Sequence, residues 1–165
     1  IVYIADRKNH VIRAMDLSKK TVSTIAGTGE QDRTDRGTGG PALKRGLNSP
    51  WDLLLDGNRL FIAMAGHHQI WTLDLEKKEV EPFAGTGREN IKDGPHEIAN
   101  FAQPSGLATD GKNLYVADCE VSAIRRVPMD GKGRVDTLVG KGLFIFGDRD
   151  GKGDDPDEET RALLQ

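Results

Sequence analysis

The side chains best suited to chemistry lie in an acidic stretch near the end of the chain. Asp148, Asp150, Asp154 and Glu159 stand at the first, third, seventh and last positions of an EF-hand type of calcium loop. Lys152, however, places a cation at the fifth position, where a further ligand is needed. No amphipathic helix is predicted on either side of the stretch. The four carboxylates are therefore candidate metal ligands, and a solvated acidic loop is the competing interpretation.

Histidine supplies a second possible ligand set, because imidazole nitrogens bind zinc. The chain has four histidines: His10, His67, His68 and His96. His67 and His68 are adjacent, and in a strand their side chains would point to opposite faces. His10 and His68 occupy the same position in successive repeats, so they lie apart rather than around one ion. We predict loop or strand-edge histidines, no bound metal and no cofactor.

Three Gly-x-Gly words, at 27–29, 85–87 and 140–142, could be mistaken for phosphate-binding loops. No helix follows any of them, and no Lys-Ser or Lys-Thr completes a P-loop. We interpret these glycines as the end of an outermost strand, where the chain turns sharply toward the next unit.

The single cysteine, Cys119, excludes an internal disulfide and allows a reducing compartment. Arg7 and Ala65 stand at the equivalent positions of the other repeats, which favours a structural thiol over a reactive one. Neither a signal peptide nor a run of apolar residues long enough to cross a membrane is present. A cytoplasmic location without membrane contact is therefore expected.

These residues are distributed over three near-copies of one pattern, which indicates stacked repeat units. The words that mark the repeats are Tyr3-Ile4-Ala5-Asp6, Phe61-Ile62-Ala63-Met64 and Tyr115-Val116-Ala117-Asp118. The Gly-x-Gly words keep the same phase. A third marker, a Pro followed three residues later by Leu, occurs at Pro50 and Pro104.

Within one unit the pattern is that of a four-stranded antiparallel meander, because short runs alternate with Gly, Asp, Asn and Lys clusters. The run 61–65 is apolar without alternation, which suits a strand covered on both faces. The predicted strands of the first unit are 2–6, 10–15 and 21–26, and complete four-stranded units are predicted over 51–84 and 105–139. The segment Glu158 to Gln165 has the pattern for about two helical turns.

The words of the third unit resemble the NHL repeat, in which each unit forms one propeller blade. They are Pro104-Ser105-Gly106-Leu107, Leu114-Tyr115-Val116-Ala117-Asp118, Ile124-Arg125-Arg126-Val127 and Thr137-Leu138-Val139-Gly140. The resemblance covers residues 1 to 142. The long loops, with Ser49-Pro50-Trp51-Asp52 and Phe144-Ile145-Phe146-Gly147-Asp148, are similar to those of the thioredoxin-like NHL-repeat proteins. In that family a thioredoxin-like domain precedes a six-bladed propeller and a small β domain follows it.

The fold class that this resemblance implies is all-β: a partial β-propeller of about three four-stranded NHL blades, out of an expected six. The first blade lacks its inner strand, and the opening at Ile1 in mid-strand is typical of a segment of a longer protein. The expected organisation is a partial blade 1–29, a linker 30–49, a blade 50–87, a linker 88–103, a blade 104–142 and an acidic linker 143–165.

The same resemblance implies protein interaction or scaffolding without chemistry in this segment. The expected partners are the remaining blades and the thioredoxin-like domain of the same polypeptide, together with an unidentified protein. One alternative is the non-catalytic part of a thiol-disulfide oxidoreductase whose active site lies upstream, since no Cys-x-x-Cys occurs here. A further alternative is a propeller lyase or lactonase.

Three aligned third-strand residues, Arg13, Trp71 and Arg125, are the candidate partner-binding residues, because Trp and Arg are enriched at interface hot spots. The competing interpretation is internal: each Arg would pair with a carboxylate such as Asp6 or Asp118, and Trp71 would fill a gap between blades. Both interpretations stay open at the level of sequence.

Charge and apolar pattern limit the possible partners. A net charge of −3 and a pI near 5.8 argue against binding to nucleic acid, which depends on clustered Lys and Arg. Three units of a six-bladed ring leave two outer faces uncovered, and Val2, Ile4, Ile124 and Val127 are predicted to lie there. Such a surface is expected to drive association.

Overall fold

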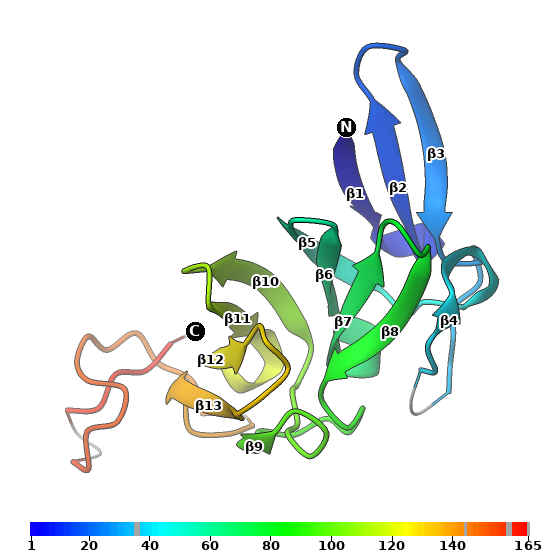
Figure 1. Ribbon diagram of the computed structural model, residues 1–165. Helices are drawn as coiled ribbons and strands as arrows, with labels where there is room; N and C mark the ends of the chain where they lie inside the picture. The colour runs from blue at the N-terminus through cyan, green and yellow to red at the C-terminus, as the bar shows by residue number, and fades with distance from the viewer. Residues whose placement is uncertain (35–36, 144, 158–159, 165) are drawn as a thin grey trace.

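The computed structural model describes residues 1–34, 37–143, 145–157 and 160–164, and three antiparallel sheets dominate it (Figure 1). We name the sheets blades A, B and C in chain order. Blade A consists of three strands, β1 (Val2–Asp6), β2 (Val11–Asp16) and β3 (Thr21–Ala26). The three predicted strands of this unit are present, the second at 11–16 rather than 10–15, and the described sheet has three strands.

Blades B and C each contain the four-stranded meander that the repeats predict. The strands of blade B are β5 (Pro50–Asp56), β6 (Arg59–Met64), β7 (Gln69–Asp74) and β8 (Glu79–Ala84). Those of blade C are β10 (Pro104–Thr109), β11 (Asn113–Asp118), β12 (Ala123–Pro128) and β13 (Arg134–Val139). The all-β, partial-propeller fold class is therefore confirmed.

Each linker adds a fifth, two-residue strand that the repeat pattern did not predict. β4 (Gly40–Pro41) pairs with the outer edge of β8, and β9 (Gly94–Pro95) pairs with the outer edge of β13. The linker thus runs along the outside of the following blade before it enters that blade's inner strand. Covering the edge in this way protects open backbone groups from pairing with another chain.

Four one-turn 3-10 helices complete the described elements: η1 (Arg7–Asn9), η2 (Ala42–Lys44), η3 (Ala65–His67) and η4 (Cys119–Val121). η1, η3 and η4 are equivalent, since each follows the repeat word and precedes the third strand of its blade's pattern. They gather at the same end of the blades as the linkers, the lower end in Figure 1.

The apolar core lies between the blades, and the period of two along each strand decides which junction a residue joins. In β6, Ile62 packs toward blade A with Ile12, whereas Phe61 packs toward blade C with Leu114. All of these side chains are inaccessible to solvent. Full burial of each stabilises the fold by about 1.5–3 kcal/mol. Because both faces of β6 are covered, its sequence is apolar without alternation.

The outer faces differ from the sequence prediction at one residue. Val2 and Ile4 are exposed at 43% and 36% on the open face of blade A, and Ile124 is half-buried on blade C. Val127, predicted to meet water, is fully buried among the residues that join blades B and C. The prediction for Val127 is wrong because residues 124 and 127, an odd number apart, point to opposite faces of β12.

The helix predicted for Glu158 to Gln165 is not present in the described part, 160–164. There Arg149 pairs with Leu163 in an antiparallel bridge, and Lys152 bridges to Arg161. The extended pairing uses the backbone groups that a helix would need. Residues 158, 159 and 165 lie outside the described residues. No helix in the described part has the length and apolar content to cross a bilayer.

Candidate functional site

The end of the blades that carries η1, η3 and η4 holds a hydrogen-bonded belt. Each of these turns closes when the N–H of the following residue donates to the first carbonyl of the turn. The closing residues are His10, His68 and Ser122, with left-handed φ values of 52°, 51° and 45°. The same left-handed conformation in three repeats aims three side chains in equivalent directions.

Two residues, Ser49 and Gln103, connect one η turn to the next. The Ser49 N–H donates to His10 Nδ1 of blade A at 3.0 Å, and its carbonyl accepts from Ala65 of η3 at 3.2 Å. The Gln103 N–H donates to His68 Nδ1 at 3.2 Å, and its carbonyl accepts from Cys119 of η4 at 3.3 Å. The belt therefore runs from η1 through η3 to η4 without leaving this end of the molecule.

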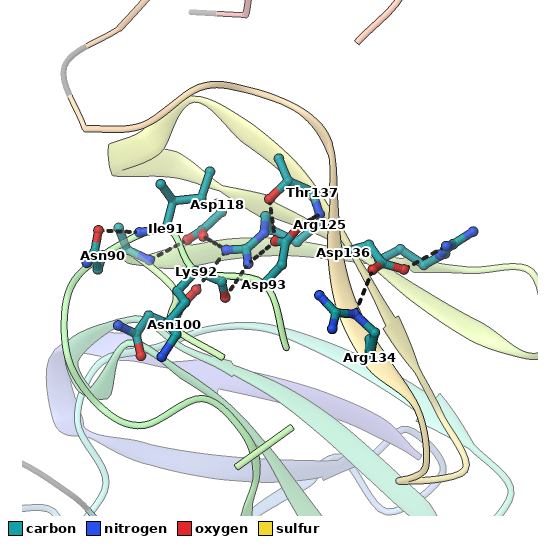
Figure 2. A network of polar contacts seen from close by, with 12 residues as sticks. Asn90, Ile91, Lys92, Asp93, Asn100, Asp118, Arg125, Arg134, Asp136 and Thr137 are labelled. Atoms are coloured by element: carbon teal, nitrogen blue, oxygen red, sulfur yellow. Dashed lines mark hydrogen bonds and ion pairs between the residues drawn. The ribbon is translucent and has the colours of Figure 1, made fainter. Parts of the chain in front are cut away.

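A buried arginine network lies beside the belt in blade C. Figure 2 shows the Arg125 guanidinium between two carboxylates, with Asp118 Oδ2 at 3.0 Å and Asp93 Oδ1 at 3.1 Å. Its other hydrogen bonds go to the carbonyls of Asn100 and Lys92, at 2.8 and 3.0 Å. The arginine thereby ties the third strand of blade C to the linker that precedes the blade.

The two carboxylates of this network have opposite pKa shifts. Burial raises the pKa of Asp118 to about 6, against the Ala102 N–H and the Arg125 charge, which favour the ionised form. Burial also acts on Asp93, but hydrogen bonds from Thr137 and the Arg125 charge outweigh it and lower the pKa of Asp93. Asp118 is thus the member of the network that binds a proton first.

The predicted partner-binding residues occupy equivalent sites with different surroundings. Arg125 and Trp71 are fully buried; Trp71 Nε1 donates to Gln69 at 3.0 Å, and its indole stacks on His67. Arg13 is half-buried and pairs with Asp6 at 2.7 Å on the open face of blade A. Neither Trp71 nor Arg125 presents a surface to a partner in this structure, and the internal interpretation describes both.

A cation–aromatic pair at the belt was missed by the sequence reasoning. The Arg7 guanidinium of η1 lies 4.2 Å from the centre of the Trp51 ring, so the pair spans the junction of blades A and B. Arg7 is exposed and Trp51 half-buried. The equivalent residues at the next junction are Ala65 and Ser105. Comparing the residues that follow each Pro of the inner strand and each repeat word could have found the pair.

The candidate metal ligands are not brought together. Asp148 and Asp150 are exposed on the strand-like segment that pairs with 161–163, Asp154 is exposed, and Glu159 lies outside the described residues. Within 1–34, 37–143, 145–157 and 160–164, no three His, Cys, Asp or Glu side chains form a potential metal site.

Cys119 is the first residue of η4 and is exposed on the belt. Burial of its sulfur, with the neighbouring charges of Glu120 and Asp118, raises the pKa of the thiol. A raised pKa leaves little thiolate, which is the nucleophilic form. The position therefore offers an accessible but unactivated thiol.

Comparison with curated proteins finds relatives that extend well beyond this chain. The chain is 40% identical over 183 aligned residues to NHL repeat-containing protein 2 of Homo sapiens, covering 93% of the chain and 25% of the relative. It is 38% identical to the protein SUPPRESSOR OF QUENCHING 1, chloroplastic, of Arabidopsis thaliana, covering 93% of the chain and 15% of that protein. The chain thus spans a quarter or less of these relatives. No family model matches the chain.

Solved structures agree on the fold. A protein of unknown function from Bacteroides thetaiotaomicron superposes with a TM-score of 0.68 at 20% identity, over 98% of this chain and 37% of that one. At this identity the likeness concerns the fold alone.

Proposed function

Because the chain belongs to the NHL-repeat β-propeller proteins, we propose that it binds protein partners through the end of the blades that carries the belt. The observation that carries the proposal is the pair of exposed Arg7 and half-buried Trp51, which stands where the next junction has Ala65 and Ser105. Tryptophan and arginine supply much of the binding energy at protein interfaces. The belt repeats from blade to blade, whereas the residues displayed beside it change.

The proposed role is scaffolding within a longer polypeptide. Its nearest partners would be further blades of the propeller and a thioredoxin-like domain, as the resemblance to the longer relatives suggests. If the whole protein is a redox enzyme with its active site in another domain, this segment would still have a binding role, because Cys119 is not activated as a nucleophile. A lyase or lactonase would need a ligand set that the described residues do not bring together.

The experiment compares partners recovered with the intact tagged protein and with two variants of the Arg7 and Trp51 pair. Arg7→Glu removes the cation from the Trp51 ring. Trp51→Phe keeps an aromatic ring but reduces the contact area. The control is Lys19→Glu in the β2–β3 turn, at the opposite end of blade A. We expect cross-linked partners to be lost with Arg7→Glu, reduced with Trp51→Phe and retained with Lys19→Glu. Equal recovery by all three variants would contradict the proposal.

A further inference from the structure

Two histidines join successive blades through the same hydrogen bond. His10 and His68 each follow an η turn in the left-handed conformation, and each accepts a backbone N–H through Nδ1. The donors, Ser49 and Gln103, directly precede the proline that begins the next blade's inner strand, and they too have positive φ values, 53° and 60°. Four unusual backbone conformations in equivalent positions thus build two copies of one contact.

The contact requires a neutral imidazole with its proton on Nε2. A neutral ring has one nitrogen that accepts, whereas a protonated ring donates through both nitrogens. Protonation at Nδ1 would therefore place the ring N–H against the backbone N–H, about 3 Å apart, and the hydrogen bond would be lost. Leaving a backbone N–H without an acceptor costs free energy of the order of a lost hydrogen bond.

The charged groups around the two rings differ. His68 faces Glu89 of the linker and Glu120 of η4, which favour the protonated ring, but burial has the larger effect and lowers the pKa of His68. The adjoining ring of His67 in η3 is a further cation when protonated. At the first junction the positions of Glu89 and Glu120 are taken by the neutral Gln31 and Gly66.

For His10 the charged residues of the same turn are Arg7 and Lys8. No carboxylate occupies the two equivalent positions there. Ser122 takes the third histidine position, and its hydroxyl does not titrate in this range. The junction of blades B and C thus combines a clasping histidine with two facing carboxylates, Glu89 and Glu120.

We propose that His68 is a proton-sensitive clasp, which holds the start of the next blade's inner strand when neutral and releases it when protonated. The inference does not depend on the proposed partner binding, because it concerns contacts within the chain. The hydrogen bond fixes the direction of the pH dependence, because the imidazole takes up a proton more readily in the unfolded chain than in the clasped state. The clasp therefore weakens as the pH falls through the ordinary range of histidine, about 6.5.

The test measures deuterium exchange of the Gln103 amide in the intact protein at about pH 7.5 and about pH 5, on either side of the ordinary histidine pKa. Exchange is divided by the intrinsic rate at each pH. In the wild-type protein we expect protection to fall by about tenfold or more at the lower pH. In His68→Ala the amide should be unprotected at both.

His68→Asn is the matched variant, because asparagine tolerates the left-handed conformation and offers a non-titrating oxygen near the place of Nδ1. It should protect the Gln103 amide at both pH values. The Thr86 amide at the end of blade B, which donates to the Ala99 carbonyl of the linker, reports on general loosening. Wild-type protection that is unchanged at the lower pH, or lost equally in His68→Asn, would overturn the proposal, even if His68→Ala fails to fold.

Discussion

At the scale of single residues, one repeat position has three different environments. Arg125 is enclosed by Asp118 of its own blade and by Asp93 of the preceding linker. Trp71 packs in the apolar core between blades A and B, and Arg13 lies half-buried on an open face. The sequence could align the three and offer Asp118 as a partner of Arg125. It could not predict the full enclosure, because Asp93 and the Lys92 and Asn100 carbonyls come from a linker outside the repeat words. Asp93, which completes the Arg125 network, belongs to no repeat word.

Removing the buried arginine should be far more costly than removing its half-buried equivalent. Arg125→Ala leaves Asp118 buried with an uncompensated charge, so we expect a loss of about 3–5 kcal/mol in the free energy of unfolding. Arg13→Ala breaks a partly solvated pair with Asp6 and should lose about 1 kcal/mol or less. Urea unfolding of the two variants checks the difference. Similar losses would mean that the linker does not enclose Arg125 as described.

Asp118 should give stability a pH dependence opposite to that of the His68 clasp. Its pKa in the folded protein, about 6, lies above the unfolded value of 3.8, so its stabilising proton is lost as the pH rises through about 6. On going from about pH 7 to about pH 5, the wild type should therefore gain stability relative to Asp118→Asn. Thermal unfolding of both proteins at each pH measures this difference, and parallel pH curves would exclude the raised pKa.

At the scale of elements, the strands were predictable and the linkers were not. Repeat phase and apolar runs located the strands of blades A, B and C, because strand sequences must satisfy the covered faces of β6 and its equivalents. The strands β4 and β9 escaped prediction, since two residues carry no periodicity. The η turns escaped for the same reason, and the belt could not be foreseen because it depends on backbone conformations at single residues.

The two glycines of the first Gly-x-Gly word differ in the space available for a side chain at the end of β3. At Gly27, with φ +95°, an added Cβ would lie 2.5 Å from the His10 carbonyl oxygen and 2.8 Å from Val11 Cα. At Gly29, with φ +91°, it would meet nothing within 4 Å. Gly29→Ala should therefore cost only the left-handed backbone penalty, about 1–2 kcal/mol.

Gly27→Ala should lower the free energy of unfolding by about 1–3 kcal/mol more than Gly29→Ala does, because the backbone of blade A must move to admit the methyl group. Chemical denaturation of both variants gives the comparison. Equal losses would show that strand β3 can shift at this turn without cost.

At the scale of the whole molecule, the two end faces are not equivalent. The open face of blade A exposes Val2, Ile4 and Val22, whereas the open face of blade C carries the Arg126 and Asp136 ion pair at 2.7 Å. The equivalent faces at the two internal junctions are covered by a neighbouring blade and its linker. The molecule therefore carries one apolar and one more polar open face.

The central claim is that this chain works by association through propeller surfaces, and its most direct test is the molar mass of the isolated chain. Light scattering at micromolar concentration should give a mass above the 18.0 kDa of one chain, because exposed apolar sheet faces associate. Replacing Val2 and Ile4 by Lys should shift the mass toward one chain. A wild-type species of 18.0 kDa with a single cooperative melt would contradict the account.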